Sequence, residues 1–368
     1  MNEYETLGHM TKIGSYPDDV RQNSYFLPHH GVFKEDSSTT KLRVVFDGSS
    51  HFPEFNSLND ILAPGPALQN DLPSIITKWR THKIAFSADI EKMFRQIDVN
   101  PDHRKFQQIL WRQNSSEPMH IYELNTVTYG TTSAPYLAIR VLHKLAEDFN
   151  NEYPKAAKVL VADSYVDDIL SGAETIDEAQ LLYTDLCDLL KSGGCNLRKW
   201  NSNSADFLSK IPEACRDSSS TICFSKDNVV KTLGVQWNIN SDSFCFNVIL
   251  DENPTISKRS ILSESARLYD PLGWLTPTTL ISKSIFKKLW EHVLDWDDKL
   301  PTELEKAWTK HRISLRELTK VKIPRWIKWS QHSPIELHCF CDASTEAYAA
   351  VVYSRMKDAA LDNGFLAE

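Results

Sequence analysis

Two adjacent carboxylates in the segment Tyr165-Val166-Asp167-Asp168 constrain the fold of this chain more than any other feature. Apolar and β-branched residues precede them, and Ile169-Leu170 follow before a Ser-Gly pair. This pattern predicts two strands joined by a tight turn, with the acids near the tip of the hairpin. Neighbouring carboxylates repel each other unless a cation binds them, and Mg²⁺ prefers carboxylate oxygen. A solvated acidic turn is the alternative for an isolated Asp-Asp pair.

A third acid, Asp89, favours a metal site over a solvated turn. It ends a segment in which Ile84, Phe86 and Ala88 alternate with other residues, as in a strand. Three carboxylates on adjacent strands can hold two Mg²⁺ ions, which clamp the attacking and leaving oxygens of an in-line phosphoryl displacement. The protein then supplies positioning and charge stabilisation.

Length and composition are those of an ordinary globular protein. The chain has 368 residues, enough for two or three structural units, with 41% hydrophobic and 24% charged residues. No apolar run is long enough to span a membrane, and no signal peptide is evident. The seven cysteines are scattered, which indicates reduced thiols of an intracellular protein.

The net charge of −8 neither supports nor excludes a nucleic-acid partner, because charge is segregated along the chain. The acidic excess falls in segments such as LDWDDKLPTELE, outside the expected template path. The basic residues of the N-terminal part, which would face a substrate, are Lys34, Lys41, Arg43, Lys78, Arg80 and Lys83.

Hydrophobic periodicity predicts helices and short strands in alternation. A helix opens at Asn70 or Asp71, another covers 134–149, and an amphipathic helix over 174–192 ends at a Gly-Gly pair. The segment KFQQILW is expected to return as a strand after the Asp89 strand. Residues 254–320 have a helical pattern rich in tryptophan, and an alternating β pattern begins near 335.

These motifs together resemble the palm of a reverse transcriptase. This resemblance rests on the pattern Asp-x-x-x-x-aromatic, then Gly-x-x-x-Ala-Pro, then Tyr-Val-Asp-Asp. More narrowly, the chain resembles the polymerase of BEL/Pao long-terminal-repeat retrotransposons, and the match runs in family order over nearly the whole chain. The segments that carry it are LPHHGVFKEDSSTTKLRVVFDGSS, SLNDILAPGPALQNDL, ADIEKMFRQI, VTYGTTSAPYLA, YVDDIL, LRKWNSN, SESARLYDPLGWLTP and LHCFCDASTEAYAAVVY.

The resemblance implies an α+β right-hand polymerase. Residues 1–250 would form the fingers and palm, 251–332 a mostly helical thumb-connection region, and 333–368 the incomplete start of a ribonuclease H-like domain. The implied reaction is RNA-directed addition of deoxynucleoside triphosphates to a primer 3′-hydroxyl on an RNA or DNA template. Two Mg²⁺ ions would assist it, with Mn²⁺ as the alternative. The implied location is a cytoplasmic retroelement particle, with nuclear access as a further option and no membrane partner.

The family's motifs assign roles to several residues of this sequence. Asp89, Asp167 and Asp168 would hold the metal ions. Phe94 would press on the sugar of the incoming nucleotide and exclude a 2′-hydroxyl, with core packing as the alternative. Lys34 and Arg43 would hold the triphosphate, as an ammonium and a guanidinium can, although Lys41 is a rival for Lys34.

Further residues complete the implied site. Tyr129, Gly130, Pro135 and Tyr165 would lie at the nucleotide or beside the metal site. Lys199 would protonate the leaving pyrophosphate, or else be a surface lysine. The primer end would be gripped by a hairpin that contains Leu233, Gly234 and Trp237, although Trp237 can also be read as an ordinary core residue.

Other activities and rival functions also follow from the motifs. Asp342 resembles the first acid of a ribonuclease H site, but the further acids of such a site are absent, so this activity is not expected. Protease and integrase motifs are not found either. The alternatives are a catalytically silent or co-opted retroelement fragment that only binds nucleic acid, and an RNA-templated RNA polymerase, against which Phe94 argues.

Overall fold

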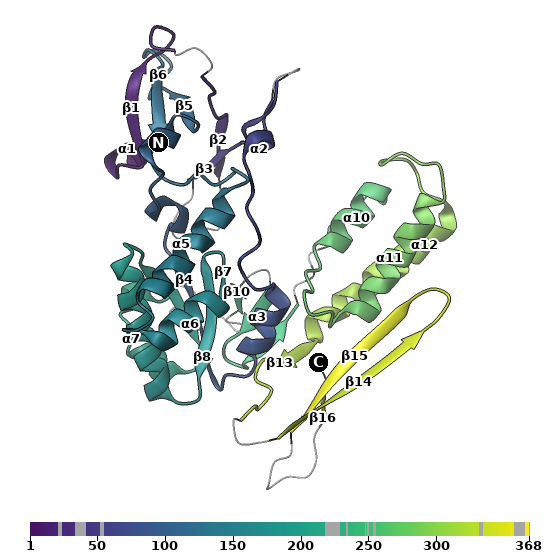
Figure 1. The fold of residues 1–368 in the computed structure, drawn as a ribbon. Coiled ribbons are helices and arrows are strands. Elements are labelled where there is room, and N and C mark those ends of the chain that lie inside the picture. The colour runs from purple at the N-terminus through teal and green to yellow at the C-terminus, as the bar shows by residue number, and fades with distance from the viewer. Residues whose placement is uncertain are drawn as a thin grey trace.

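The computed structural model describes residues 1–20, 24–33, 42–51, 55–217, 229–232, 235–246, 248, 250–252, 255–330, 334–356 and 365–367. Within these ranges the strands form several small sheets, and helices cover or separate them (Figure 1). The mixed α/β organisation that the sequence predicts is therefore confirmed, with five sheets among the described residues.

The central sheet is antiparallel and carries the three acids of the sequence motifs. Its order is β7-β8-β4-β9, so the hairpin β7–β8 lies on one side of β4 and β9 on the other. Alternate residues of β4 face opposite sides, as the pleat of a strand requires. The strands are β4 (Ile84–Ile90), β7 (Ser164–Tyr165), β8 (Asp168–Ala173) and β9 (Leu197–Ser202).

Both faces of this sheet are buried under helices. Phe86 and Ile169 lie in the core beneath α5 (Ala134–Asp148), α6 (Pro154–Ala162) and α7 (Ile176–Ser192). Ala85 and Leu170 face the other side and pack with α3 (Leu72–Trp79). The helices begin where capping predicts: the Asp71 side chain accepts from Ser74 N, and Thr175 forms a capping box with Glu178.

The N-terminal part forms a separate pair of small sheets. Met10, Phe46, Ile109 and Leu124 belong to their shared apolar core. The segment KFQQILW returns as a strand after the Asp89 strand, as expected, and this strand, β5, pairs with β6. The elements are α1 (Asn2–Thr6), β1 (Met10–Ser15), β2 (His29–Phe33), β3 (Leu42–Phe46), α2 (Leu58–Ile61), η1 (Met93–Gln96), α4 (Pro101–Arg104), β5 (Gln108–Trp111) and β6 (His120–Leu124).

A four-stranded sheet follows in which the last strand comes from far along the chain. Its order is β10-β11-β12-β13, and β13 pairs with β12 after a long helical insertion. The strands are β10 (Val229–Thr232), β11 (Val235–Asn238), β12 (Ser243–Cys245) and β13 (Lys322–Pro324). Two short helices, α8 (Ala205–Ser209) and η2 (Glu213–Cys215), precede this sheet.

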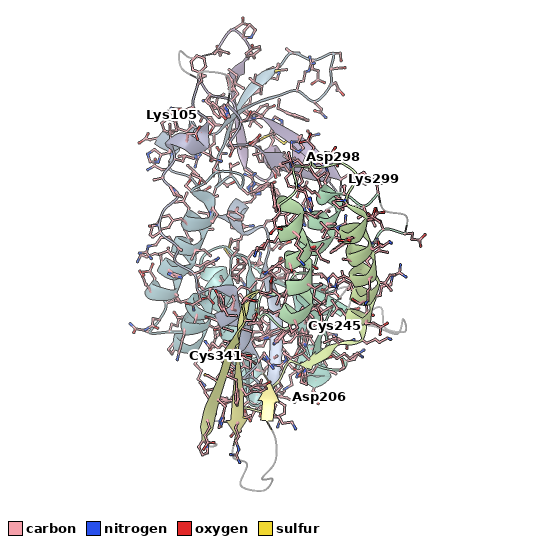
Figure 2. The ribbon with its side chains drawn as sticks, turned by 90° about the vertical axis from the view of Figure 1, so that its right-hand side faces the viewer. Lys105, Asp206, Cys245, Asp298, Lys299 and Cys341 are labelled. Atoms are coloured by element: carbon pink, nitrogen blue, oxygen red, sulfur yellow. The ribbon has the colours of Figure 1, made fainter. Side chains whose placement is uncertain are left out.

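The insertion is a helical unit with its own core. Ile261, Leu289, Trp308 and Leu315 are buried together in it. A buried ion pair crosses this unit, because Arg312 donates to both carboxylate oxygens of Glu264 at 2.7–3.0 Å. In the turned view, Asp298 and Lys299 lie at the upper end of these helices (Figure 2). The helices are α10 (Lys258–Ala266), α11 (Thr276–Trp290), α12 (Thr302–Leu315) and η3 (Arg316–Lys320).

The chain closes with a long hairpin. Strand β14 (Ile335–Ala343) pairs with β15 (Tyr348–Met356), which pairs with β16 (Phe365–Ala367). Asp342 lies at the exposed end of β14, opposite Ala349. Cys341 is exposed next to it, on the strands below the helices in Figure 2. The boundaries at 250 and 332 that the resemblance implies stay predictions.

Arg325 joins the central sheet's helix α3 to the four-stranded sheet. Its side chain is completely buried and donates to both oxygens of Asp242 at 2.6 and 2.7 Å. It also donates to the carbonyl oxygens of Trp79 and His82 at 3.0 and 2.8 Å. Asp242 in turn accepts from the indole of Trp237 at 2.9 Å. One guanidinium therefore holds three chain segments in place.

We expect Arg325→Met to destabilise the fold by about 3 kcal/mol, since it leaves Asp242 without its main cationic partner and several carbonyl groups without a donor. Urea unfolding followed by fluorescence would measure the change. Arg259→Met is the matched control, because Arg259 pairs with Asp297 on the exposed surface, where such pairs contribute about 0–1 kcal/mol. Equal effects of the two substitutions would contradict the assignment.

Candidate active site

The three acids predicted as metal ligands meet at one end of the central sheet. Asp89 near the end of β4 is paired with Asp168 at the start of β8. Tyr165 and Asp168 close the β7–β8 hairpin, so Val166 and Asp167 form its turn. The carbonyl oxygen of Asp167 also accepts from Ile90 N at 2.7 Å, next to Asp89. The predicted hairpin with acids at its tip is thus present.

The turn that carries Asp167 is strained. Val166 has φ of 55°, and a β-branched residue rarely adopts this left-handed conformation. The backbone N–H of Val166 donates to the side-chain oxygen of Gln69 at 3.2 Å. The neighbouring Asn70 donates to the carbonyl oxygen of Ala162 at 3.0 Å. The segment before α3 therefore supports the turn from outside the hairpin.

Burial and neighbouring negative charge raise the pKa of Asp167 and of Asp168. Burial, followed by the charges of Asp167 and Asp89, raises the pKa of Asp168 from 3.8 to about 7. Burial and the charge of Asp89 also raise the pKa of Asp167, while Lys199 and Arg43 oppose this rise. Negative charge is therefore concentrated here beyond what the surroundings neutralise, which favours binding of a cation.

Lys199 supplies the nearest positive charge. It lies on β9, has φ of 54°, and its Nζ donates to Asp89 Oδ2 at 2.9 Å. Its ammonium is about two-fifths exposed. Lys199 is therefore more than an isolated surface lysine, since it contacts one of the three acids directly.

The described residues contain no ready-made cluster of three or more His, Cys, Asp or Glu side chains that could hold a metal ion. The three acids therefore do not converge on one point, and one oxygen of Asp89 accepts from the Lys199 ammonium. Their donor chemistry nevertheless fits a hard divalent ion, because all three offer carboxylate oxygens and two have pKa values raised by burial and by the charges of their neighbours.

Two aromatic residues of the predicted nucleotide site, Phe94 and Tyr129, lie near each other. Phe94 in η1 is partly buried against the core beneath the sheet, and its ring lies 6.4 Å from that of Tyr129. Tyr129 donates to the carbonyl oxygen of Val44 at 2.5 Å, and burial raises its pKa to about 12. Gly130 has φ of 95°, and a Cβ there would lie 2.2 Å from the carbonyl oxygen of Phe46, so no larger residue fits. Pro135 lies in the first turn of α5.

The other predicted site residues are placed less directly. Arg43 on β3 is exposed, and its charge acts on Asp167. Trp237 is completely buried, with its ring 4.7 Å from that of Trp79, so its placement fits the alternative of core packing. Lys34, its rival Lys41, Leu233 and Gly234 lie outside the described residues.

Two residues near the site, Gln69 and Arg95, were not identified from the sequence. Gln69 supports the acidic turn, but nothing in the pattern before α3 indicates this. Arg95 is buried directly after Phe94 and contacts the ring of Tyr4, which lies far away in sequence. An arginine inside the apolar stretch around Phe94 is the one hint that sequence reading could have used.

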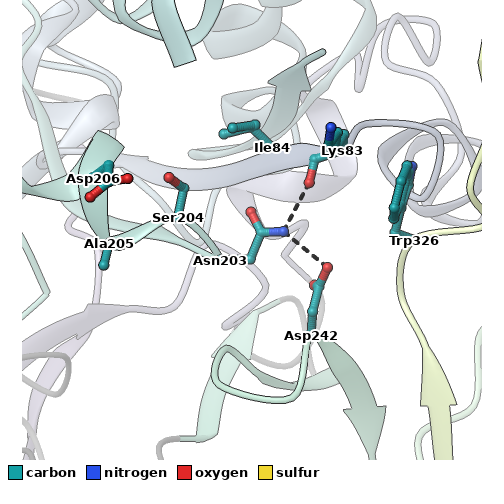
Figure 3. Close-up of a pocket in the computed structure, with 8 residues that line it drawn as sticks. All are labelled: Lys83, Ile84, Asn203, Ser204, Ala205, Asp206, Asp242 and Trp326. Atoms are coloured by element: carbon teal, nitrogen blue, oxygen red, sulfur yellow. Dashed lines mark hydrogen bonds between the residues drawn. The ribbon is translucent and has the colours of Figure 1, made fainter. Parts of the chain in front are cut away.

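A pocket of about 420 Å³ lies elsewhere, at the start of β4. Because β4 has seven residues, Asp89 lies about 15–20 Å from Ile84, which lines this pocket. Asn203 bridges its wall, donating to Lys83 O at 2.9 Å and to Asp242 at 3.0 Å (Figure 3). The polar groups of Asn203 and Asp242 are thus already engaged in joining chain segments.

We expect Asp168→Asn to raise the melting temperature at pH 8 by at least about 2 °C when no divalent ion is present. In the folded protein Asp168 keeps its proton up to a higher pH than in the unfolded chain. The loss of stability caused by its charged carboxylate therefore grows between about pH 4 and 7 and is complete above pH 7. The rise in melting temperature of Asp168→Asn should therefore be smaller at pH 4.5 than at pH 8. Mg²⁺ should stabilise the parent more than the variant at pH 8.

The control for this measurement is Asp177→Asn, which changes an acid whose side chain is 98% exposed. Its melting temperature should follow that of the parent at both pH values. A gain for Asp168→Asn that is equal at pH 4.5 and pH 8 would contradict the assignment of the penalty to the Asp168 charge.

Two protein-family models match the chain. The model described as reverse transcriptase (RNA-dependent DNA polymerase) matches residues 37–234, which include all three acids. The model described as Pao retrotransposon-like RNaseH-like domain matches residues 257–365, from the start of the helical unit to the C-terminal hairpin. No curated protein matches the chain.

The first match covers more than half of the chain, and the second agrees with the narrower resemblance in the sequence motifs. No helix among the described residues is long and apolar enough to cross a membrane. The chain belongs to the reverse transcriptase (RNA-dependent DNA polymerase) family, and its C-terminal part is similar to the Pao retrotransposon-like RNaseH-like domain.

Proposed function

We propose that this RNA-directed DNA polymerase extends a primer on an RNA or DNA template with Asp89, Asp167 and Asp168 as the ligands of two Mg²⁺ ions. The observation that carries the proposal is the pairing of Asp89 with Asp168, with Asp167 in the adjoining turn. The concentration of negative charge at this point supports it, because burial and mutual repulsion raise two of the pKa values.

The reaction joins the primer 3′-oxygen to the α-phosphorus of a deoxynucleoside triphosphate and breaks the bond to pyrophosphate. Divalent ions bound to the acids would stabilise charge on the attacking and leaving oxygens. Asp89 and Asp168 lie opposite each other on adjacent strands, so both could bind these ions. The 3′-hydroxyl loses its proton and pyrophosphate gains one.

Lys199 is proposed as the general acid that protonates the leaving pyrophosphate. Its ammonium lies 2.9 Å from Asp89, so it starts within reach of the reacting groups. Occupation of Asp89 by a metal ion would release this ammonium from its ion pair. It could then donate a hydrogen bond to a phosphate oxygen.

The nucleotide would bind beside Phe94 and Tyr129. Arg43 is exposed and its charge acts on Asp167, which supports a role in holding the triphosphate. Gly130 lets the backbone approach closely next to Tyr129. Tyr165 flanks the acids opposite Asp168. Lys34 keeps its proposed triphosphate role from the sequence alone.

Template and primer would be held mainly through phosphate contacts and base stacking. In this proposal the central sheet is the palm, the N-terminal sheets are the fingers, and the helical unit α10–α12 is the thumb-connection region. The hairpin β10–β11 would grip the primer through its backbone, with Trp237 anchoring it in the core. Leu233 and Gly234 keep their proposed place in the primer grip from the sequence alone. A cytoplasmic retroelement particle is the proposed location.

We expect Asp167→Asn to abolish extension of a primer on an RNA template with deoxynucleotides and Mg²⁺ or Mn²⁺, since an amide is a poor substitute for a carboxylate ligand. Gel analysis of extended primer would measure it. Asp177→Asn, an exposed acid of α7, should extend primer as the parent does. Extension by Asp167→Asn would refute the metal-ligand role.

We expect Phe94→Val to weaken discrimination against ribonucleotides by about tenfold or more, because a smaller side chain leaves space for a 2′-hydroxyl. The measurement is the ratio of kcat/KM for a deoxynucleotide and the matching ribonucleotide. Phe94→Tyr keeps the ring and should keep the discrimination. An unchanged ratio in Phe94→Val would leave Phe94 as a core residue only.

A further inference from the structure

Arg95, which directly follows Phe94, is buried among aromatic rings. Its side chain is only 5% exposed. The guanidinium carbon lies 4.5 Å from the ring centre of Tyr4, 4.9 Å from that of Tyr129 and 5.2 Å from that of Phe46. Cation–π attraction is strong where the cation is shielded from water, so these rings hold the guanidinium in place.

Arg95 has few hydrogen bonds for a buried cation. Nη1 donates to Thr126 Oγ1 at 3.2 Å, whereas Nε and Nη2 find no acceptor within the part of the chain that the structure describes. A buried charge with so few hydrogen bonds lowers the stability of the fold. This cost indicates that the rings around Arg95 are arranged for the function of the site.

The N-terminal helix α1 is docked onto this cluster at two points. Tyr129 uses its single hydroxyl hydrogen on the carbonyl oxygen of Val44, so Tyr4 donates to the Tyr129 hydroxyl at 2.9 Å. Glu3 forms an ion pair of 2.6 Å with Lys92, three residues after Asp89. Helix α1 precedes the residues 37–234 that match the reverse transcriptase family.

The contacts continue from Tyr129 to Phe94. The two rings lie 6.4 Å apart at 61°, an edge-to-face arrangement. Tyr129 is therefore fixed on one side by the Tyr4 hydroxyl and the Arg95 guanidinium, and it contacts Phe94 on another. Loss of the Tyr4 hydroxyl would leave Tyr129 held only through Val44 and Arg95, so its ring could shift where it lies against Phe94.

We propose that Tyr4 and Arg95 are positioning residues for nucleotide selection, which hold Tyr129 against Phe94 and make helix α1 a part of the nucleotide site. This inference rests on the proposed function, because it takes Phe94 to contact the sugar. Neither Tyr4 nor Arg95 touches the reacting groups. They act on the shape of the site, so nucleotide affinity and sugar discrimination should change more than turnover.

The test uses the full chain with Tyr4→Phe and Arg95→Lys in primer extension. Tyr4→Phe removes one hydrogen bond and should raise KM for deoxynucleotides and weaken deoxy-over-ribo discrimination by about 3- to 10-fold each, with kcat within about twofold. Arg95→Lys keeps the charge but loses the planar stacking of the guanidinium on the rings. It should raise KM and weaken discrimination more than Tyr4→Phe does.

The matched control is Tyr25→Phe. Tyr25 packs against the same apolar cluster, but its hydroxyl donates to the carbonyl oxygen of Ser50 at 3.0 Å. Its removal should leave KM and discrimination unchanged. If Arg95→Lys fails to fold, Tyr4→Phe and this control decide the question alone.

The outcomes separate this inference from the proposed function. A parent chain that neither extends primer nor is stabilised against heat by a deoxynucleoside triphosphate overturns the proposed function, and the inference falls with it. A parent that extends primer, beside a Tyr4→Phe variant that matches it in KM and discrimination, overturns the inference alone. A Tyr4→Phe variant that has a lower melting temperature but unchanged discrimination against ribonucleotides also overturns the inference alone.

Discussion

Electrostatic repulsion among three carboxylates is the constraint on which the rest of this structure depends. Asp89 and Asp168 meet because β4 pairs with β8, and Asp167 is held next to them in a turn that Val166 enters with a left-handed backbone. Such an arrangement persists only where the surroundings over-determine it. Helices on both faces of the sheet, and the Gln69 side chain at the turn, provide that rigidity.

Lys199 offsets part of the negative charge of these acids. Its ammonium contacts Asp89 and lowers the local excess of negative charge, while two-fifths of its side chain stays exposed to water. A partly exposed ion pair is weak and easily exchanged. The same residue can therefore compensate the resting site and leave Asp89 free for a stronger cation.

Sequence reading predicted the elements whose signals are local. The acidic hairpin, the strand that ends near Asp89 and the helix over 176–192 follow from periodicity and capping, and their bounds agree within a few residues. Contacts between distant segments leave no periodic signal, so the support of Val166 by Gln69 and the burial of Arg95 beside Tyr4 were missed.

The insertion of the helical unit between β12 and β13 has a consequence for how the chain can be divided. Strand β13 and Arg325 lie after the helices, yet they complete the sheet and the packing around Trp79 that begin before them. A fragment that ended at residue 250 would therefore expose the edge of β12 and leave Asp242 without its guanidinium. Loop closure across the helices must precede the final ordering of that sheet, so its assembly would be a late and cooperative event in folding.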